Sequence, residues 1–293
     1  MKKLFEGVGI AIVTPFLNNK VDYKSLKNLL HKGISEGASA IIVLGTTGEG
    51  TTVSQKERDE IIKFCRKEIK DPVKMIVGSG NNNFETCLEN TRIAKELGAD
   101  GVLVVTPYYN KTTQHGLVRY YEDIAKIEIP IIIYNVPART GLNIEVSTLE
   151  KILSSNQWVY GIKESTADIT RIMALFNVCK EKIAVYSGED DLNYVFYCLG
   201  GMGTISVTAN AFCKEVDKIY QCVKKEDLEK ALSEHEKLSP INKLMFCETN
   251  PVPVKYFLQE MDIIERAEVR RPLVELLQEN KDKIDDMLDM IEY

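Results

Sequence analysis

The sequence predicts an α/β protein: a (β/α)8 barrel of the TIM type with a C-terminal helical appendage. Eight short runs rich in β-branched residues recur along the 293-residue chain, each followed by a turn and a segment of helical periodicity. The runs are continuously apolar, which is typical of strands buried on both faces of a parallel sheet. Eight such units over about 210 residues fit a (β/α)8 barrel. A doubly wound sheet is disfavoured because no Gly-x-Gly-x-x-Gly follows the first run.

The predicted elements follow one another at regular intervals. Ser54 and Glu57 have the spacing of a capping box, and Gly37 and Gly98 are typical helix-stop glycines. The glycine-rich stretch 200–203 resembles a phosphate loop, but it precedes the eighth strand, so we interpret it as a helix stop. The strands are expected at residues 8–13, 40–44, 73–77, 101–105, 129–134, 158–163, 183–186 and 203–207, and the first three crossover helices at 22–36, 54–69 and 83–97.

The pattern changes near residue 225, where the β-branched runs stop. Helical segments continue to Tyr293, with one sharp break at Asn-Pro-Val-Pro, residues 250–253. We therefore predict a catalytic barrel at residues 1–224 and a C-terminal helical domain at 225–293. No Gly-, Ser- or Pro-rich linker separates them, so the helices should pack on the barrel.

Composition excludes several classes of function. The formal net charge of −6 argues against a nucleic-acid partner, which requires a clustered basic face. Seven cysteines without a Cys-x-x-Cys pair indicate free thiols in a reducing compartment. No run approaches the roughly 20 apolar residues of a membrane span, and the first residues lack the apolar core of a signal peptide. We expect a cytoplasmic protein without a metal site, since the three histidines have no ligand spacing.

One lysine stands out because it ends an apolar run. Lys163 follows residues 158–162, and in a barrel the carboxyl ends of the strands face the active site. Burial disfavours the charged ammonium, and a neutral amine attacks carbonyls, as in Schiff-base enzymes. The alternative is a strand-end lysine that reaches solvent or pairs with Glu164.

The other predicted strand ends carry hydroxyl groups rather than charges. Schiff-base chemistry requires groups that move protons during dehydration, and phenols and alcohols can do so beside an amine. Alternatives remain open for each. Residues 45–48 could form a plain tight turn or an anion cradle, and the two adjacent tyrosines could pack in a loop or an interface. The hydroxyl residues at issue are Thr46, Thr47, Tyr108, Tyr109 and Tyr134.

Five motifs occur in a fixed order along essentially the whole chain. They are Gly-Thr-Thr-Gly-Glu at 45–49, Val-Thr-Pro-Tyr-Tyr-Asn at 105–110, Tyr-Asn-Val-Pro-Ala-Arg-Thr-Gly at 134–141, Gly-Ile-Lys-Glu-Ser at 161–165 and Glu-Thr-Asn-Pro-Val-Pro-Val-Lys at 248–255. Together they resemble the dihydrodipicolinate synthase family, which belongs to the pyruvate-dependent class I aldolases. The barrel alone would not indicate a function.

The resemblance implies a reaction in which pyruvate condenses with L-aspartate 4-semialdehyde to 4-hydroxy-tetrahydrodipicolinate, the first step of the diaminopimelate route to lysine. It implies that Lys163 forms the imine with pyruvate and that Tyr134 is the acid/base phenol. Thr46 would link Tyr134 to Tyr109, contributed across a tight dimer interface. No cofactor is implied, and the expected assembly is a homo-oligomer: a tight dimer that pairs into a tetramer.

The resemblance also implies how the substrates bind. Backbone amides at Thr46 and Thr47 would hold the pyruvate carboxylate, and Arg139 would hold the carboxylate of the second substrate, which a guanidinium fork fits. Gly188 and Ile205 correspond to positions that line the pocket through backbone atoms.

Of two alternatives, the first lies within the same superfamily and the second belongs to a different class of protein. N-acetylneuraminate lyase and sugar-acid aldolases share the lysine and the tyrosine, but Arg-Thr-Gly at 139–141 and Asn-Pro-x-Pro-Val-Lys at 250–255 follow the synthase pattern. A barrel kept as a scaffold without turnover should have lost at least one of Lys163, Tyr134, Thr46, Tyr109 and Arg139, and all five are present.

The chain departs from the feedback-sensitive members that it resembles. Those members bind lysine at the dimer interface with a histidine and a carboxylate. Tyr108 and Asn82 match that pattern, but Gln55 stands at the histidine position and Thr86 at the carboxylate position. Glu85 is adjacent but should point in another direction, so we predict weak or absent inhibition by lysine.

Overall fold

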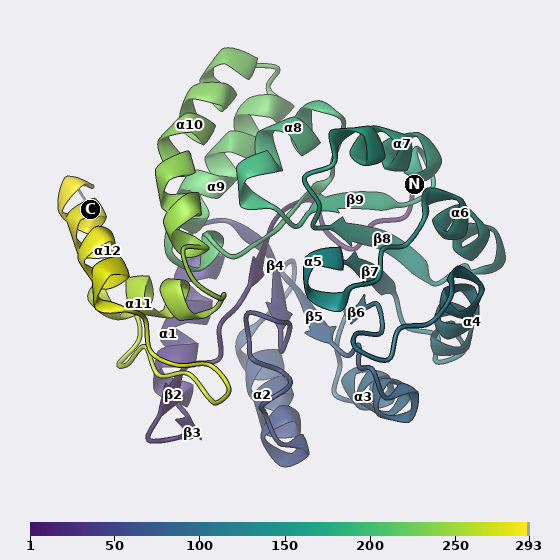
Figure 1. The fold of residues 1–293 in the computed structure, drawn as a ribbon, viewed down its shortest axis with the longest axis horizontal. Coiled ribbons are helices and arrows are strands. Elements are labelled where there is room, and N and C mark those ends of the chain that lie inside the picture. Colours follow the sequence, from purple (N-terminus) through teal and green to yellow (C-terminus); the bar gives the residue numbers. More distant parts are fainter. Residues whose placement is uncertain (292–293) are drawn as a thin grey trace.

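A computed structural model describes residues 1–291. Its centre is a closed barrel of eight parallel strands, in the order β1-β10-β9-β8-β7-β6-β5-β4 (Figure 1). All eight predicted strands are confirmed, and no strand end differs from the prediction by more than two residues. The short antiparallel hairpin of β2 (Phe16–Leu17) and β3 (Lys20–Val21) was not predicted. The barrel strands are β1 (Gly7–Ala11), β4 (Ala38–Val43), β5 (Lys74–Gly78), β6 (Gly101–Val105), β7 (Ile131–Asn135), β8 (Val159–Glu164), β9 (Ala184–Ser187) and β10 (Gly203–Ser206).

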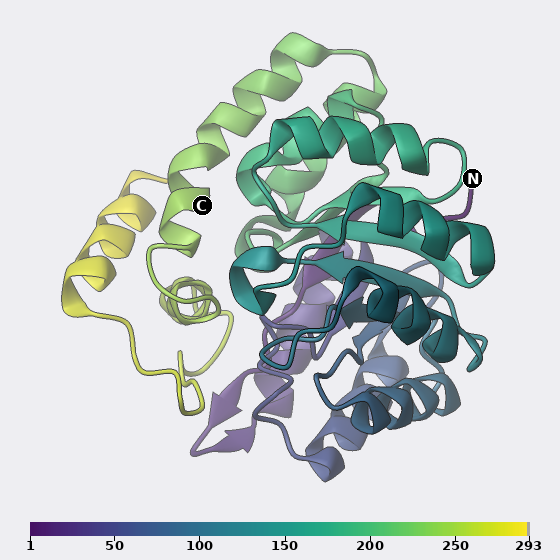
Figure 2. The same cartoon turned by 45° about the vertical axis from the view of Figure 1, so that its right-hand side comes forward.

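Helices surround the barrel as an outer layer (Figures 1 and 2). Two short elements, α5 (Pro137–Thr140) and the 3-10 turn η1 (Asp190–Leu192), follow β7 and β9. The outer helices are α1 (Tyr23–Ser35), α2 (Gln55–Glu68), α3 (Phe84–Glu96), α4 (Gln114–Ala125), α6 (Val146–Ser155), α7 (Ile169–Cys179), α8 (Asn193–Cys198) and α9 (Ala209–Lys224). The fold predicted from the sequence is therefore confirmed.

Local sequence signals set the helix boundaries. Ser54 accepts a hydrogen bond from the Glu57 amide, and the Glu57 carboxylate accepts one from the Ser54 amide, which completes the predicted capping box of α2. Gly37 and Gly98 adopt φ values of +106° and +83°, as helix-stop glycines do. Gly200 has φ +91° and follows α8, so the interpretation of 200–203 as a helix stop is confirmed.

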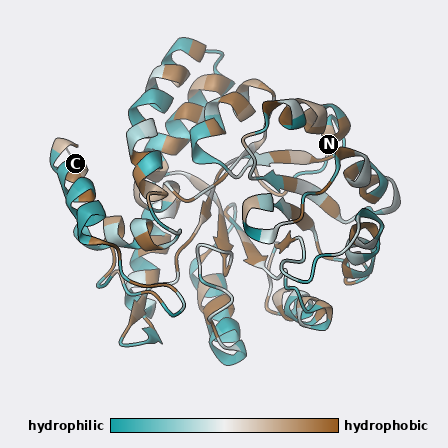
Figure 3. Cartoon of the chain, in the orientation of Figure 1, coloured by the Kyte–Doolittle hydropathy of each residue, from teal (hydrophilic) through white to brown (hydrophobic). Residues whose placement is uncertain are grey.

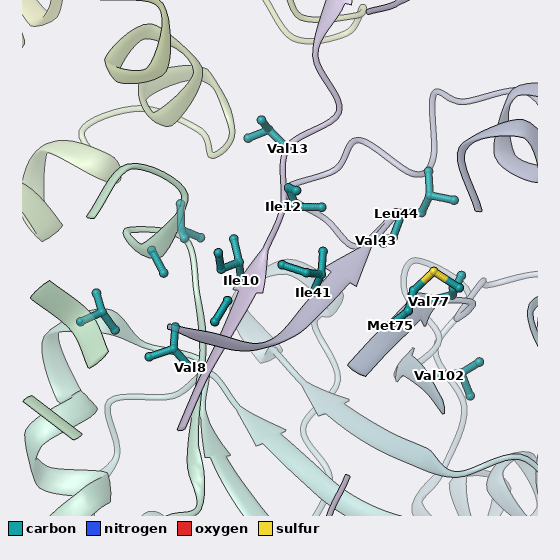
Figure 4. Close-up of a cluster of buried hydrophobic side chains, with 14 of the residues drawn as sticks. Val8, Ile10, Ile12, Val13, Ile41, Val43, Leu44, Met75, Val77 and Val102 are labelled. Carbon is teal, nitrogen blue, oxygen red and sulfur yellow. The ribbon is translucent and has the colours of Figure 1, made fainter. Parts of the chain in front are cut away.

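Alternation along each strand divides the core into two layers. In β4, Ala40 and Ile42 belong to the cluster inside the barrel, whereas Ile41 and Val43 belong to the cluster between strands and helices (Figure 4). Both kinds of position are apolar, which produced the continuous runs seen in the sequence. Figure 3 shows strands that are mostly apolar, surrounded by helices that are partly polar.

The C-terminal helices cover one side of the barrel (Figure 2). They are α10 (Leu228–Met245), α11 (Val252–Glu260) and α12 (Gln278–Met290). Met245 and Phe257 are fully buried in the cluster that also contains the outward-facing strand residues. The division at residue 224 stays a prediction, because the helices share this core with the barrel. All seven cysteines are free, and five of them are buried.

No helix within residues 1–291 has both the length and the apolar character needed to cross a membrane.

The ion pair between Glu57 on α2 and Arg270 in the C-terminal segment predicts how the stability of the fold depends on pH in acid. Two hydrogen bonds of 2.9 and 2.6 Å from the Arg270 guanidinium lower the pKa of Glu57 from 4.5 to about 2. Because the folded pKa lies below the unfolded one, the contact stabilises the fold above pH 4.5 and is lost as the pH falls toward about 2. We expect Glu57→Gln to lower the free energy of unfolding at pH 7 by about 1 kcal/mol, since the pair is partly exposed.

Urea unfolding at pH 7 and pH 3 measures this effect. When the pH is lowered from 7 to 3, the free energy of unfolding should fall less in Glu57→Gln than in the wild type. The matched control is Glu150→Gln, on the exposed face of α6, which should follow the wild type. Equal acid losses in the wild type and in Glu57→Gln would show that the pair does not respond to pH as proposed.

Candidate active site

Lys163 lies at the carboxyl end of β8, inside the mouth of the barrel. Its side chain is buried, with 5% of the residue exposed. Lys163 and Tyr134 are paired across β8 and β7, and the lysine Nζ lies 4.4 Å from the centre of the Tyr134 ring. Within residues 1–291, no hydrogen bond or ion pair engages this Nζ. The solvent-reaching lysine considered as an alternative is therefore wrong, and the amine is free to react.

Glu164 does not pair with Lys163, because it faces the opposite side of the strand. Its carboxylate accepts hydrogen bonds from Arg171 at 2.9 Å and from Asn135 at 2.8 Å. Burial raises the pKa of Glu164, and the Arg171 charge opposes that rise. Asn135 and Glu164 are also register partners, so this contact fixes the tips of β7 and β8 that carry Tyr134 and Lys163.

A cavity of about 290 Å³ opens beside Tyr134 at the strand ends. Thr46 and Arg139 line it, so the structure brings three predicted site residues together. Tyr108, for which the sequence leaves a loop and an interface position open, lines it as well. Arg139 is on α5, and Pro137 at the start of that helix favours its first turn.

The loop after β4 forms a tight turn and also presents backbone N–H groups that have no acceptor among the described residues. Glu49 N–H donates to the Thr46 carbonyl at 3.1 Å, and Gly50 N–H donates to the Gly45 carbonyl at 3.3 Å. Among the described residues, the amides of Thr46 and Thr47 have no acceptor. Adjacent free amides in a turn form an anion-binding nest, so the two alternatives for residues 45–48 are compatible.

The three remaining predicted site residues lie outside the lining of the cavity. They are Tyr109, Gly188 and Ile205. Tyr109 lies outside the cavity, is 90% exposed and has φ +70°. A Cβ added at Gly188 would collide with the Ser165 Oγ and come within 2.8 Å of the Lys163 Cε, so glycine keeps the space beside the lysine open. Ile205 is buried in the inner cluster together with Tyr134.

Asn250 joins the site through contacts that the sequence pattern does not indicate. Its side-chain amide donates to the Thr47 hydroxyl at 2.9 Å, and its backbone carbonyl accepts from Arg139 at 3.3 Å. It thereby connects the two positions expected to bind substrate carboxylates. It belongs to the motif at 248–255, which predicts a break between helices and contributes to the family resemblance but does not indicate a contact with the loop after β4.

A buried amine at a barrel strand end, beside a phenol, hydroxyls and free amides, defines the site of a class I aldolase, which works through a Schiff base. The chain matches the model of the dihydrodipicolinate synthetase family over residues 4–291 and belongs to that family. No group of three or more His, Cys, Asp or Glu within residues 1–291 is placed to hold a metal ion.

Comparison with individual relatives and solved structures gives the same family. The chain is 43% identical to a 4-hydroxy-tetrahydrodipicolinate synthase from Thermodesulfovibrio yellowstonii, covering 97% of this chain and 98% of the relative. It is 40% identical to one from a Thermoanaerobacter species, covering 97% and 96%. The crystal structure of dihydrodipicolinate synthase from Thermotoga maritima superposes with a TM-score of 0.96 at 39% identity, covering 98% of both chains.

Proposed function

We propose that this chain condenses pyruvate with L-aspartate 4-semialdehyde to 4-hydroxy-tetrahydrodipicolinate through a Schiff base on Lys163. The reaction is the first step of the diaminopimelate route to lysine, and the enzyme is a lyase of the class I aldolase type. The observation that carries the proposal is the buried Lys163 amine, which lies 4.4 Å from the centre of the Tyr134 ring and has no partner among the described residues.

The first half of the reaction forms an imine. The lysine Nζ attacks the keto carbon of pyruvate, and the carbinolamine loses water after its hydroxyl receives a proton from the Tyr134 phenol. The free amides of Thr46 and Thr47 bind the pyruvate carboxylate, which orients the keto carbon toward the amine. Gly188 leaves room for the adduct because a side chain there would meet the Lys163 Cε.

The second half forms the carbon–carbon bond. The Tyr134 phenolate left by the dehydration takes a proton from the pyruvate methyl group, which converts the imine to an enamine. The methylene carbon of the enamine attacks the aldehyde of the second substrate, and the aldehyde oxygen takes up the proton that Tyr134 returns. Arg139, at the mouth of the cavity, binds the carboxylate of that substrate. The amino group of the semialdehyde then displaces Lys163 and closes the ring, which returns the free amine.

The proton route extends to a partner subunit. Thr46 passes protons between Tyr134 and Tyr109 of the neighbouring protomer in a homodimer, and two dimers form a tetramer. The exposed aromatic ring of Tyr109 supports an intersubunit position, since large exposed aromatic residues are enriched at interfaces. One solved relative, 39% identical with a TM-score of 0.95, is described as the first monomeric dihydrodipicolinate synthase variant. We also propose a cytoplasmic location and the division into domains 1–224 and 225–293.

A coupled assay tests the substrate assignment. Pyruvate is offered with either L-aspartate 4-semialdehyde or N-acetylmannosamine. We expect kcat/KM to favour the semialdehyde by at least about a hundredfold, because a site built for a small carboxylate leaves polar groups unpaired with the wrong partner. Preference for the mannosamine would identify an N-acetylneuraminate lyase, and absence of turnover with both would support a scaffold protein.

Inhibition by lysine should be weak or absent. Gln55 is held by Asp59 at 2.9 Å, and Thr86 supplies no charge for the ligand ammonium. Arg58, whose pKa burial lowers to about 10, remains a cation at pH 7 and lines the cavity with Tyr108. A missing charged partner typically costs a few kcal/mol, which corresponds to roughly a hundredfold in affinity.

Titration of the coupled assay with lysine checks this prediction. We expect little inhibition at millimolar lysine and stronger inhibition of Thr86→Glu, which restores a carboxylate. Half-inhibition of the wild type at submillimolar lysine would contradict the prediction.

A further inference from the structure

Glu49 lies in the loop between β4 and α2, shortly after the two free amides, and its side chain points into the protein. The residue is 3% exposed and has φ +50°, a conformation that non-glycine residues rarely adopt. Its backbone N–H donates to the Thr46 carbonyl at 3.1 Å. The Thr46 carbonyl and the Thr47 N–H belong to one planar peptide group. The position of Glu49 therefore controls the direction in which the Thr47 N–H points.

The C-terminal segment holds the Glu49 carboxylate. Lys255, on α11, is fully buried and donates to one carboxylate oxygen at 2.5 Å. The backbone N–H of Arg270 donates to the other oxygen at 2.9 Å. Lys255 Nζ also donates to the Glu268 carbonyl at 2.8 Å and lies 4.3 Å from the centre of the Phe16 ring. Both hydrogen-bond donors to this carboxylate thus come from beyond residue 250.

A buried ion pair such as Glu49–Lys255 is weak evidence for a contribution to the stability of the fold. Removing two charges from water is unfavourable, and apolar side chains of similar volume often replace a buried ion pair without loss of stability. Burial lowers the pKa of Lys255 to about 8, and the Glu49 charge opposes that change. A buried pair does, however, fix direction and distance more narrowly than apolar packing.

We propose that Glu49 and Lys255 are positioning residues that hold the amides of Thr46 and Thr47 in register with the pyruvate carboxylate, so that the C-terminal helices set the affinity for pyruvate. The inference rests on the proposed function, because it assigns a ligand to those amides. The Asn250 side chain donates to the Thr47 hydroxyl and not to a backbone group of the loop, so it does not orient the same peptide group.

The test compares pyruvate affinity with stability. The measured quantity is the pyruvate concentration that gives half-maximal adduct on Lys163 after borohydride reduction, together with both KM values and urea unfolding. For Lys255→Met we expect this pyruvate concentration to rise at least about tenfold, since a misplacement of about 1 Å is costly in a site of this kind. KM for the semialdehyde should change less than about threefold, because its carboxylate binds elsewhere.

Two further variants separate positioning from stability. In Lys255→Met combined with Glu49→Leu, no unpaired charge is buried, so the free energy of unfolding should recover. Pyruvate affinity should stay weak, because the loop has lost its anchor. The matched control is Tyr256→Phe, the next residue of α11, which loses only a contact to Asp285 and should bind pyruvate as the wild type does.

The proposal is overturned by recovery of pyruvate affinity together with stability in the double variant, or by an equal loss of affinity in Tyr256→Phe. If Lys255→Met does not fold, Glu49→Gln decides: it keeps the shape and loses the charge, and unchanged pyruvate affinity in this variant also overturns the proposal. A wild type that forms no adduct at any pyruvate concentration contradicts the proposed function instead, which keeps the two failures distinct.

Discussion

Replacing Lys163 by alanine is expected to lower kcat for the condensation by about 10⁴-fold or more, as loss of a covalent nucleophile typically does. The amine is buried, and no hydrogen bond or ion pair engages it among the described residues. Within residues 1–291 Lys255 is the other buried lysine, and it is bound to Glu49 and to the Glu268 carbonyl. Initial rates with both substrates, measured for purified Lys163→Ala, check this expectation.

The control for Lys163→Ala is Lys151→Ala, which removes an exposed lysine from α6. This variant should keep the wild-type rate. Urea unfolding must show that Lys163→Ala is folded, so that lost activity reports chemistry rather than stability. A folded Lys163→Ala that retains more than about a hundredth of the wild-type kcat would show that the reaction does not need a covalent lysine.

Mixing two inactive variants should restore activity if Tyr109 acts across a subunit boundary. Loss of an acid/base phenol costs typically 10²–10⁴-fold, so Tyr109→Phe alone should be nearly inactive, as should Lys163→Ala. In a mixed dimer, one site combines an intact lysine with the partner's intact tyrosine, and the other site carries both changes. Random exchange of equal amounts should therefore return about a quarter of wild-type activity, since half of the dimers are mixed and each has one working site.

The assay needs proof that subunits have exchanged. Native mass spectrometry of the mixture counts the mixed dimers before activity is measured. Recovery in proportion to their number supports a shared site. An inactive mixture that contains the expected mixed dimers would assign Tyr109 to its own subunit and remove the intersubunit route from the mechanism.

The sequence predicted the barrel because its signals are local. Strand residues such as Ile41 and Ile42 face two different apolar layers, so the run looks continuous. Caps such as Ser54 fix helix starts within four residues. The hairpin at 16–21 escaped prediction because two-residue strands leave no periodic pattern.

The part of the site that depends on local sequence signals could also be predicted. Lys163 could be placed because it ends a strand, and the fold brings strand ends together. The contacts from Asn250 and Lys255 could not be predicted, because their partners in the loop after β4 lie 203 and 206 residues away in sequence. Only the packing of the C-terminal helices brings them together. In the proposed mechanism Tyr109 contacts a second chain, and the sequence pattern of one chain does not indicate which residues of a partner it would meet.

The most direct test of the central claim is borohydride reduction of the wild-type protein in the presence of pyruvate, followed by peptide mass spectrometry. The proposed mechanism predicts one reduced pyruvate adduct per chain, on the peptide that contains Lys163, and none when pyruvate is omitted. An adduct on a different lysine, or no adduct at saturating pyruvate, would contradict it.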